Sequence, residues 1–185
     1  MVSVTALLVP ALVSAVLVFI ASSIIHMLTP WHAGDFKRLP NEDGVLSALR
    51  PFNLAPGTYV APRPASMKDM GTPEFQAKAK LGPNVTLQVR PAGATGIGRQ
   101  LGLWFVFSFV VALLAGYLTG KAQQAGADYM VIFKFVAAIT FVAYTGGLWQ
   151  QSIWYGGWAV TLKSTIDGLL YALLTGGAFG WLWPR

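Results

Sequence analysis

Residues 4–28 read VTALLVPALVSAVLVFIASSIIHML, a stretch without Asp, Glu, Lys or Arg whose one ionisable side chain, His26, stands near its end. About 20 consecutive apolar residues are enough to cross the hydrocarbon core of a bilayer. A secretory signal peptide would begin with Lys or Arg and carry a shorter apolar stretch, and Met1-Val2-Ser3 holds no basic residue. The sequence therefore predicts a retained transmembrane helix, with Pro10 in its first turns or at a kink.

Three more apolar stretches follow the first, at 101–119, 130–150 and 166–183. The four stretches predict an all-α membrane protein, built as a four-transmembrane-helix bundle. The polar connection at 120–128 is short, so the second and third helices should be antiparallel neighbours. The connection at 151–165 is rich in Trp and Gly, which favours a segment lying in the membrane interface.

The composition agrees with a membrane protein. Hydrophobic residues make up 55% of the 185-residue chain, charged residues only 11%, and the mean hydropathy is +0.56. A soluble domain of this size has about 25% charged residues, which rules out an ordinary soluble fold. The chain has no cysteine, so disulfides, thiolate metal sites and cysteine nucleophiles are excluded.

The residues between the first two spans are patterned like a small folded module, which gives the organisation 1–28, 29–99 and 100–185. Asn41 before two acidic residues predicts a capped helix through Leu49. Thr72-Pro73-Glu74 predicts the start of another helix, which should end at Gly82. Stretches rich in β-branched residues predict two short strands, at 58–60 and 85–89.

This mixed module has few apolar residues, so it should be marginal alone and lean on the bundle or on a partner. The glycine-rich residues 93–98 that follow it lack the spacing of a dinucleotide-binding loop. They predict a flexible connection into the second span.

The net charge of +6 comes mainly from residues 29–99, which hold nine Lys/Arg and five Asp/Glu. The basic residues are scattered and few aromatic side chains lie among them, so we expect no nucleic-acid partner. Membrane proteins keep Lys and Arg on the cytoplasmic side. The asymmetry predicts a cytoplasmic 29–99 loop, N- and C-termini outside, and the lipid bilayer as a partner.

Small residues recur at four-residue spacing in two spans. Gly116 and Gly120 lie in the second span, and Gly176 and Gly180 lie in the fourth. Glycines at this spacing let helix backbones approach closely in lipid. We expect close packing within the chain at both pairs, with a dimer contact as the weaker alternative.

Polar side chains recur at helical spacing in the last two spans: Thr140, Tyr144 and Gln151 in the third, and Asp167, Tyr171 and Thr175 in the fourth. The two faces should meet inside the bundle and hydrogen-bond with each other. Such contacts between helices are the favoured interpretation, and a substrate path is the alternative.

Charged and metal-ligating side chains near the membrane are few. Lys163 and Asp167 are four residues apart, which predicts an ion pair at the mouth of the fourth span. His26 and His32 are six apart with Pro30 between them, which is poor geometry for sharing one ion. We therefore predict interfacial histidines, no catalytic residue, no metal ligand and no cofactor, and we expect that the chain is not an enzyme.

Several segments resemble a family of small uncharacterised bacterial integral membrane proteins with four spans. They are GLWQQSIWY at 147–155, DGLLYALLT at 167–175, FGWLWP at 179–184, GTY at 57–59 and MGTPE at 70–74. The resemblance implies a bacterial inner membrane location and supplies no site residue.

The leading functional hypothesis is a membrane scaffold or accessory subunit that binds another membrane protein. The alternative is a small uncoupled channel or carrier. Coupled transport is disfavoured because a proton relay needs a carboxylate or histidine deep in the membrane.

Overall fold

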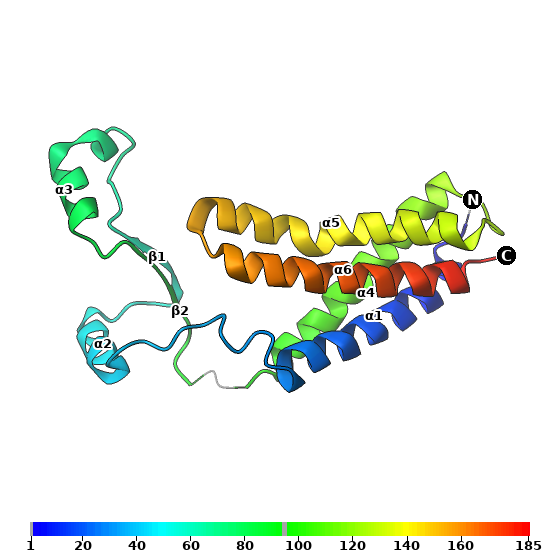
Figure 1. Ribbon diagram of the computed structural model, residues 1–185, viewed down its shortest axis with the longest axis horizontal. Coiled ribbons are helices and arrows are strands. Elements are labelled where there is room, and N and C mark those ends of the chain that lie inside the picture. The colour runs from blue at the N-terminus through cyan, green and yellow to red at the C-terminus, as the bar shows by residue number, and fades with distance from the viewer. Residues whose placement is uncertain (1, 94–95) are drawn as a thin grey trace. The chain divides into compact units, whose positions relative to one another are not determined.

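The chain is mostly helical, with one small two-stranded sheet (Figure 1). The computed structural model describes residues 2–93 and 96–185. They divide into two compact units, Met1–Lys37 with Ile97–Arg185, and Arg38–Gly96. The glycine-rich connection predicted at 93–98 includes residues 94 and 95, which lie outside the described residues.

The first unit is a bundle of four long helices: α1 (Leu8–Ser23), α4 (Gly98–Ala122), α5 (Tyr129–Tyr155) and α6 (Trp158–Leu182). A 3₁₀ turn, Thr5–Leu7, precedes α1, and a π-helical turn, Ile24–Leu28, extends it. Pro10 is the third residue of α1, where its missing N–H costs no helical hydrogen bond. In Figure 1, α5 and α6 run side by side, and α1 packs against both α4 and α6.

Three of the described helical segments are long and apolar enough to cross a membrane: Thr5–Leu28, Gly98–Ala122 and Tyr129–Tyr155. The fourth predicted span, 166–183, is helical too, but its helix α6 begins eight residues earlier at Trp158. This earlier start brings Lys163 into the helix. The bundle therefore contains three membrane-capable helices and a fourth, α6, of similar length and lower hydropathy.

The connection between the third and fourth helices is shorter than the predicted 151–165. Helix α5 continues to Tyr155 and α6 begins at Trp158, so only Gly156 and Gly157 lie between them. Gly156 and Gly157 make the turn with φ angles of 79° and 92°, a left-handed conformation that glycine adopts without a steric penalty. These two glycines let α5 and α6 pack as an antiparallel helical hairpin.

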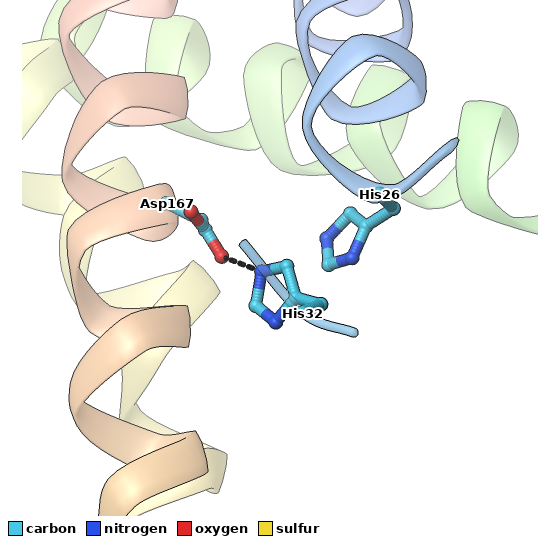
Figure 2. A group of neighbouring side chains, drawn as sticks. All are labelled: His26, His32 and Asp167. Atoms are coloured by element: carbon cyan, nitrogen blue, oxygen red, sulfur yellow. Dashed lines mark hydrogen bonds and ion pairs between the residues drawn. The ribbon is translucent and has the colours of Figure 1, made fainter. Parts of the chain in front are cut away.

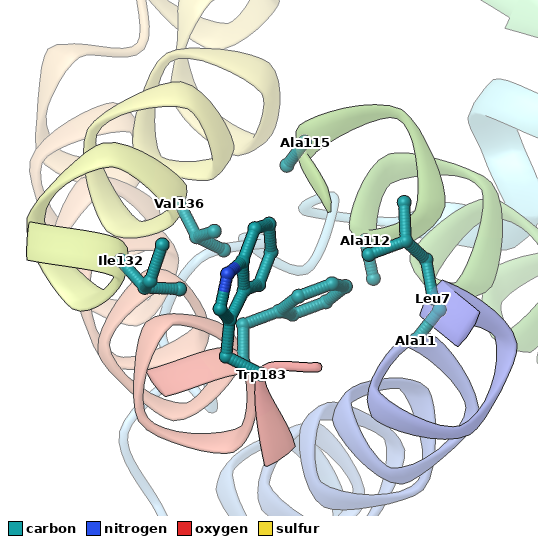
Figure 3. Close-up of a cluster of buried hydrophobic side chains, with 8 residues drawn as sticks. Leu7, Ala11, Ala112, Ala115, Ile132, Val136 and Trp183 are labelled. Atoms are coloured by element: carbon teal, nitrogen blue, oxygen red, sulfur yellow. The ribbon is translucent and has the colours of Figure 1, made fainter. Parts of the chain in front are cut away.

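The larger hydrophobic core lies at the end of the bundle that holds both termini (Figures 1 and 3). Alanines of α1 and α4 face larger side chains of α5, α6 and the C-terminal segment. The buried residues of this cluster are Leu7, Ala11, Ala112, Ala115, Ile132, Val136, Phe179 and Trp183. A second cluster, Val18, Val111, Tyr144 and Tyr171, lies further along the same four helices.

The glycine pairs stand where helices touch. A Cβ on Gly116 of α4 would overlap the ring of Phe179 on α6. A Cβ on Gly176 of α6 would lie 2.8 Å from the backbone oxygen of Phe133 on α5. Gly180 is as close to Tyr129, with 2.8 Å to its ring, and Gly120 meets Val2 at 3.3 Å. Both pairs thus mark close contacts within one chain.

The second unit contains the predicted module, and its four elements are confirmed. They are α2 (Glu42–Leu49), β1 (Gly57–Ala61), α3 (Pro73–Leu81) and β2 (Val85–Val89). The Asn41 side chain accepts a hydrogen bond from the Gly44 N–H, and the Thr72 hydroxyl accepts one from the Phe75 N–H, so both predicted caps form.

The strands β1 and β2 pair antiparallel, with Tyr59 opposite Leu87. None of the described side chains of this unit is buried, in keeping with its few apolar residues. The unit begins at Arg38 rather than at residue 29, because residues 29–37 belong with the helices.

Candidate functional site

The segment after α1 returns to the bundle and binds α6 through a chain of ion pairs. His32 Nε2 lies 2.7 Å from Asp167 Oδ2, and His32 Nδ1 lies 2.5 Å from Asp35 Oδ2. Lys163 Nζ completes the chain at 2.7 Å from Asp35 Oδ1. Lys163 also donates a hydrogen bond to the backbone oxygen of Trp31. Two residues of α6 therefore fasten residues 31–35 to the bundle.

These side chains are largely removed from solvent. The Asp35 side chain is 5% exposed, that of Asp167 6% and that of His32 12%. Because a carboxylate faces each ring nitrogen of His32, the pairs are complete when both nitrogens carry protons. Hydrogen bonds from Lys163, and then from His32, hold the pKa of the Asp35 carboxyl below its usual range. Asp35 therefore stands as an ionised carboxylate between the Lys163 amine and the His32 ring.

The ion pair predicted between Lys163 and Asp167 is wrong. No ion pair joins them in the described part of the chain; Lys163 binds Asp35, and Asp167 binds His32. Both residues are on helix α6, but the returning segment offers each a partner at hydrogen-bonding distance. Lys163 and Asp167 pair with Asp35 and His32 rather than with each other, because Asp35 and His32 are buried against α6.

The poor geometry for sharing one ion that the spacing of His26 and His32 predicted is also wrong. Their rings stack with centroids 4.2 Å apart, because the chain reverses between them after the π-helical turn. Figure 2 shows both rings beside Asp167. One ligand atom from each of His26, His32 and Asp167 lies within 4.8 Å of the other two. These are the residues of the site that are able to hold a metal ion.

A cavity of about 490 Å³ opens beside this group. His26 comes from the turn after α1, Trp104 from α4, Tyr144 from α5, and Asp167 and Tyr171 from α6, so all four helices contribute to its lining. The three aromatic rings pack together, with centroids 5.6 to 6.0 Å apart. Trp104 is fixed by a hydrogen bond from its indole N–H to the Ser22 hydroxyl. The cavity therefore has an apolar body with His26 and Asp167 at its polar edge.

The two predicted polar faces meet only in part. Thr140 is buried, and its hydroxyl donates to the backbone of its own helix at Val136. Tyr144 and Tyr171 contact each other through their rings, at 5.6 Å between centroids. Gln151 is exposed and takes no part. Packing of the Tyr144 and Tyr171 rings joins these faces.

The sequence interpretation missed Asp35 and Trp104, and it gave His32 no role. The sequence does contain a pattern that points to Asp35, because it lies three residues after His32. In the structure these residues form a turn, in which the Asp35 N–H donates a hydrogen bond to the His32 backbone oxygen. A histidine and an aspartate at this spacing next to a membrane span are candidates for a buried pair.

The chain matches no protein-family model, no curated protein and no solved structure.

Proposed function

We propose that this chain is a four-span integral membrane protein that binds a small molecule in the cavity between its helices. The proposal rests on one observation, the cavity of about 490 Å³ lined by all four helices. Ligand pockets in proteins commonly have volumes of 300–1,000 Å³, mainly apolar walls and a few fixed polar groups. A matching ligand has an apolar body and a polar group that meets His26 and Asp167.

The fourth span is part of this proposal. Helix α6 has 25 residues, which corresponds to about 37 Å at 1.5 Å per residue, and it lies along α5. Its two charged side chains, Lys163 and Asp167, are both paired with residues of the 29–37 segment. Pairing lowers the cost of placing these charges near lipid, and the rest of α6 is uncharged.

The orientation predicted from Lys and Arg belongs to the same proposal. With four spans, both termini lie outside and residues 29–99 lie in the cytoplasm. His26, His32 and Asp167 then lie at the cytoplasmic end of the bundle. A bacterial inner membrane is the location that the sequence resemblance favours.

A small uncoupled channel or carrier was the alternative hypothesis drawn from the sequence, and the cavity supports the carrier. The scaffold or accessory subunit remains a prediction without a structural feature of its own. The many exposed apolar side chains of α1, α4 and α5 are what lipid contact alone requires, if these helices are embedded.

Native mass spectrometry of the full chain, purified in mild detergent, tests the proposal. We expect a co-purifying small molecule that is lost when Ser164→Trp fills the cavity. Leu162→Trp is the matched control, because Leu162 is exposed on the same helix and does not line the cavity. No bound molecule in the unsubstituted chain, or equal loss in both variants, would contradict it.

A further inference from the structure

We propose that His26, His32 and Asp167 bind a divalent transition-metal ion of the Zn²⁺ type at the end of the bundle. Figure 2 shows the three side chains converging from the turn after α1, the returning segment and α6. Their ligand atoms lie within 4.8 Å of one another. Imidazole nitrogen and carboxylate oxygen are both ligands of Zn²⁺. This inference goes beyond the proposed function and does not depend on what fills the cavity.

The second ring nitrogen of His32, Nδ1, faces a carboxylate, as it does in many metal-binding histidines. Histidines that bind metals direct one nitrogen at the ion and give the other N–H to a carboxylate, which fixes the orientation of the ring. His32 directs Nε2 at the Asp167 carboxylate and Nδ1 at Asp35, 2.5 Å away. Lys163 holds the other oxygen of Asp35 at 2.7 Å. The support that a metal-binding histidine needs is therefore already in place.

His26 has no structural role in the chain of ion pairs. Its ring stacks on His32, and its Nε2 has a single long contact of 3.5 Å with the Tyr171 hydroxyl. A salt bridge between the returning segment and α6 needs only His32, Asp35, Lys163 and Asp167. A role as the third metal ligand accounts for the position of the His26 ring beside this network.

The backbone that presents His26 is unusual. Residues Ile24–Leu28 form a π-helical turn, the wider turn that is rare and often found at functional sites. It is followed at once by the reversal that brings His32 back. Ligands of a tetrahedral Zn²⁺ at 2.0–2.1 Å are roughly 3.3 Å apart, so metal binding separates His32 Nε2 slightly from Asp167 Oδ2, 2.7 Å away, and adjusts the position of His26. The exposed His26 ring is the member free to make that movement.

Charge favours a cation at this position. Metal ligands bind as neutral imidazole and ionised carboxylate. With His32 neutral, the group of Asp35, Asp167 and Lys163 carries two negative charges and one positive charge. A divalent cation offsets the excess negative charge in a largely buried setting.

The metal site adjoins the cavity. His26 and Asp167 both line it. Three protein ligands with an open position are typical of catalytic rather than structural zinc sites, and two histidines with one carboxylate also hold non-haem iron. The site therefore offers the metal a position for water or for a molecule that enters the cavity.

The test uses the full chain in detergent, carrying an affinity tag without histidine and stripped with a chelator. Titration with Zn²⁺ alone, and with Co²⁺ followed by its visible spectrum, should give one ion per chain. His26→Ala should weaken Zn²⁺ binding by at least about 100-fold, and Asp35→Asn by about 10- to 100-fold, the usual effect of the group behind a ligand. Asp43→Asn, which removes an exposed carboxylate of the other unit, is the matched control and should bind normally.

His26→Ala is the decisive variant because it leaves every ion pair of the site intact. Zn²⁺ should raise the melting temperature of the unsubstituted chain and leave that of His26→Ala unchanged, while the two metal-free proteins melt alike. A chain that retains no Zn²⁺ or Co²⁺ after dialysis would overturn the inference. So would Zn²⁺ affinities that are equal in His26→Ala, in Asp43→Asn and in the unsubstituted chain.

Discussion

His32 and Asp167 are 135 residues apart in the chain, and their side chains meet at 2.7 Å. This contact fixes the segment that follows the π-helical turn after α1 to Asp167, the tenth residue of α6. The contact also gives the Asp167 carboxylate, whose side chain is only 6% exposed, a hydrogen-bonding partner from outside its own helix.

Lys163 should couple to Asp35 rather than to Asp167. Its amine lies 2.7 Å from an Asp35 oxygen, and no direct ion pair joins it to Asp167 within the described residues. In a double-mutant cycle on thermal unfolding, Lys163→Met and Asp35→Asn together should cost less than the sum of the single changes. The cycle of Lys163→Met with Asp167→Asn is the comparison. A larger coupling free energy between Lys163 and Asp167 than between Lys163 and Asp35 would instead support the ion pair expected from the sequence.

Gly116→Ala should destabilise the bundle by about 1–3 kcal/mol, the usual cost of overpacking a filled core. The added methyl group overlaps the Phe179 ring, which is completely buried and has no room to move. Thermal unfolding in detergent measures the change. Gly102→Ala on the same helix is the control, because a Cβ there meets no atom within 4 Å and should cost nothing. Equal stability of the two variants would show that α4 and α6 do not pack at Gly116.

Gly176→Ala should also lower the unfolding temperature, for a different reason. Its new methyl group would lie 2.8 Å from the backbone oxygen of Phe133, which no change of side-chain rotamer relieves. Gly177→Ala changes the neighbouring residue of the same helix, where the nearest atom is 3.8 Å away. We expect Gly177→Ala to keep or raise stability, because alanine favours helix over glycine by about 1 kcal/mol. The opposite ranking would place α5 against another face of α6.

The apolar stretches were sufficient to predict the helices of the bundle, because periodicity and length decide which segments cross a membrane. The module was predicted from its caps, since Asn41 and Thr72 are local signals that act within four residues. The site could not be predicted in the same way. His32 and Asp35 reach Asp167 and Lys163 only through the reversal after residue 28, and no local pattern encodes a contact between residues 128 or more apart.

The number of spans is tested by reporter fusions. A periplasm-active reporter placed after Arg185 should be active, because four crossings return the chain to the side of the N-terminus. The same reporter near Met70 should be silent, because the sequence predicts a cytoplasmic 29–99 loop. If the reporter is active at the N-terminus but silent after Arg185, the chain crosses the membrane three times and α6 lies on the membrane surface. Activity at both Arg185 and Met70 would contradict the arrangement altogether.

The return of residues 31–35 to α6 is the central claim, and cysteine cross-linking measures it most directly because the chain has no cysteine of its own. The variant His32→Cys with Asp167→Cys keeps Lys163 and Asp35 to hold the segment in place. A short bifunctional thiol reagent, such as dibromobimane, should consume both thiols and add one linker mass per chain. The pair Ser3→Cys with Asp167→Cys is the control, since Ser3 follows Val2, which packs against the core cluster of Leu7 and Trp183 rather than beside Asp167. Cross-linking of the His32 pair no faster than that of the control pair would contradict the account.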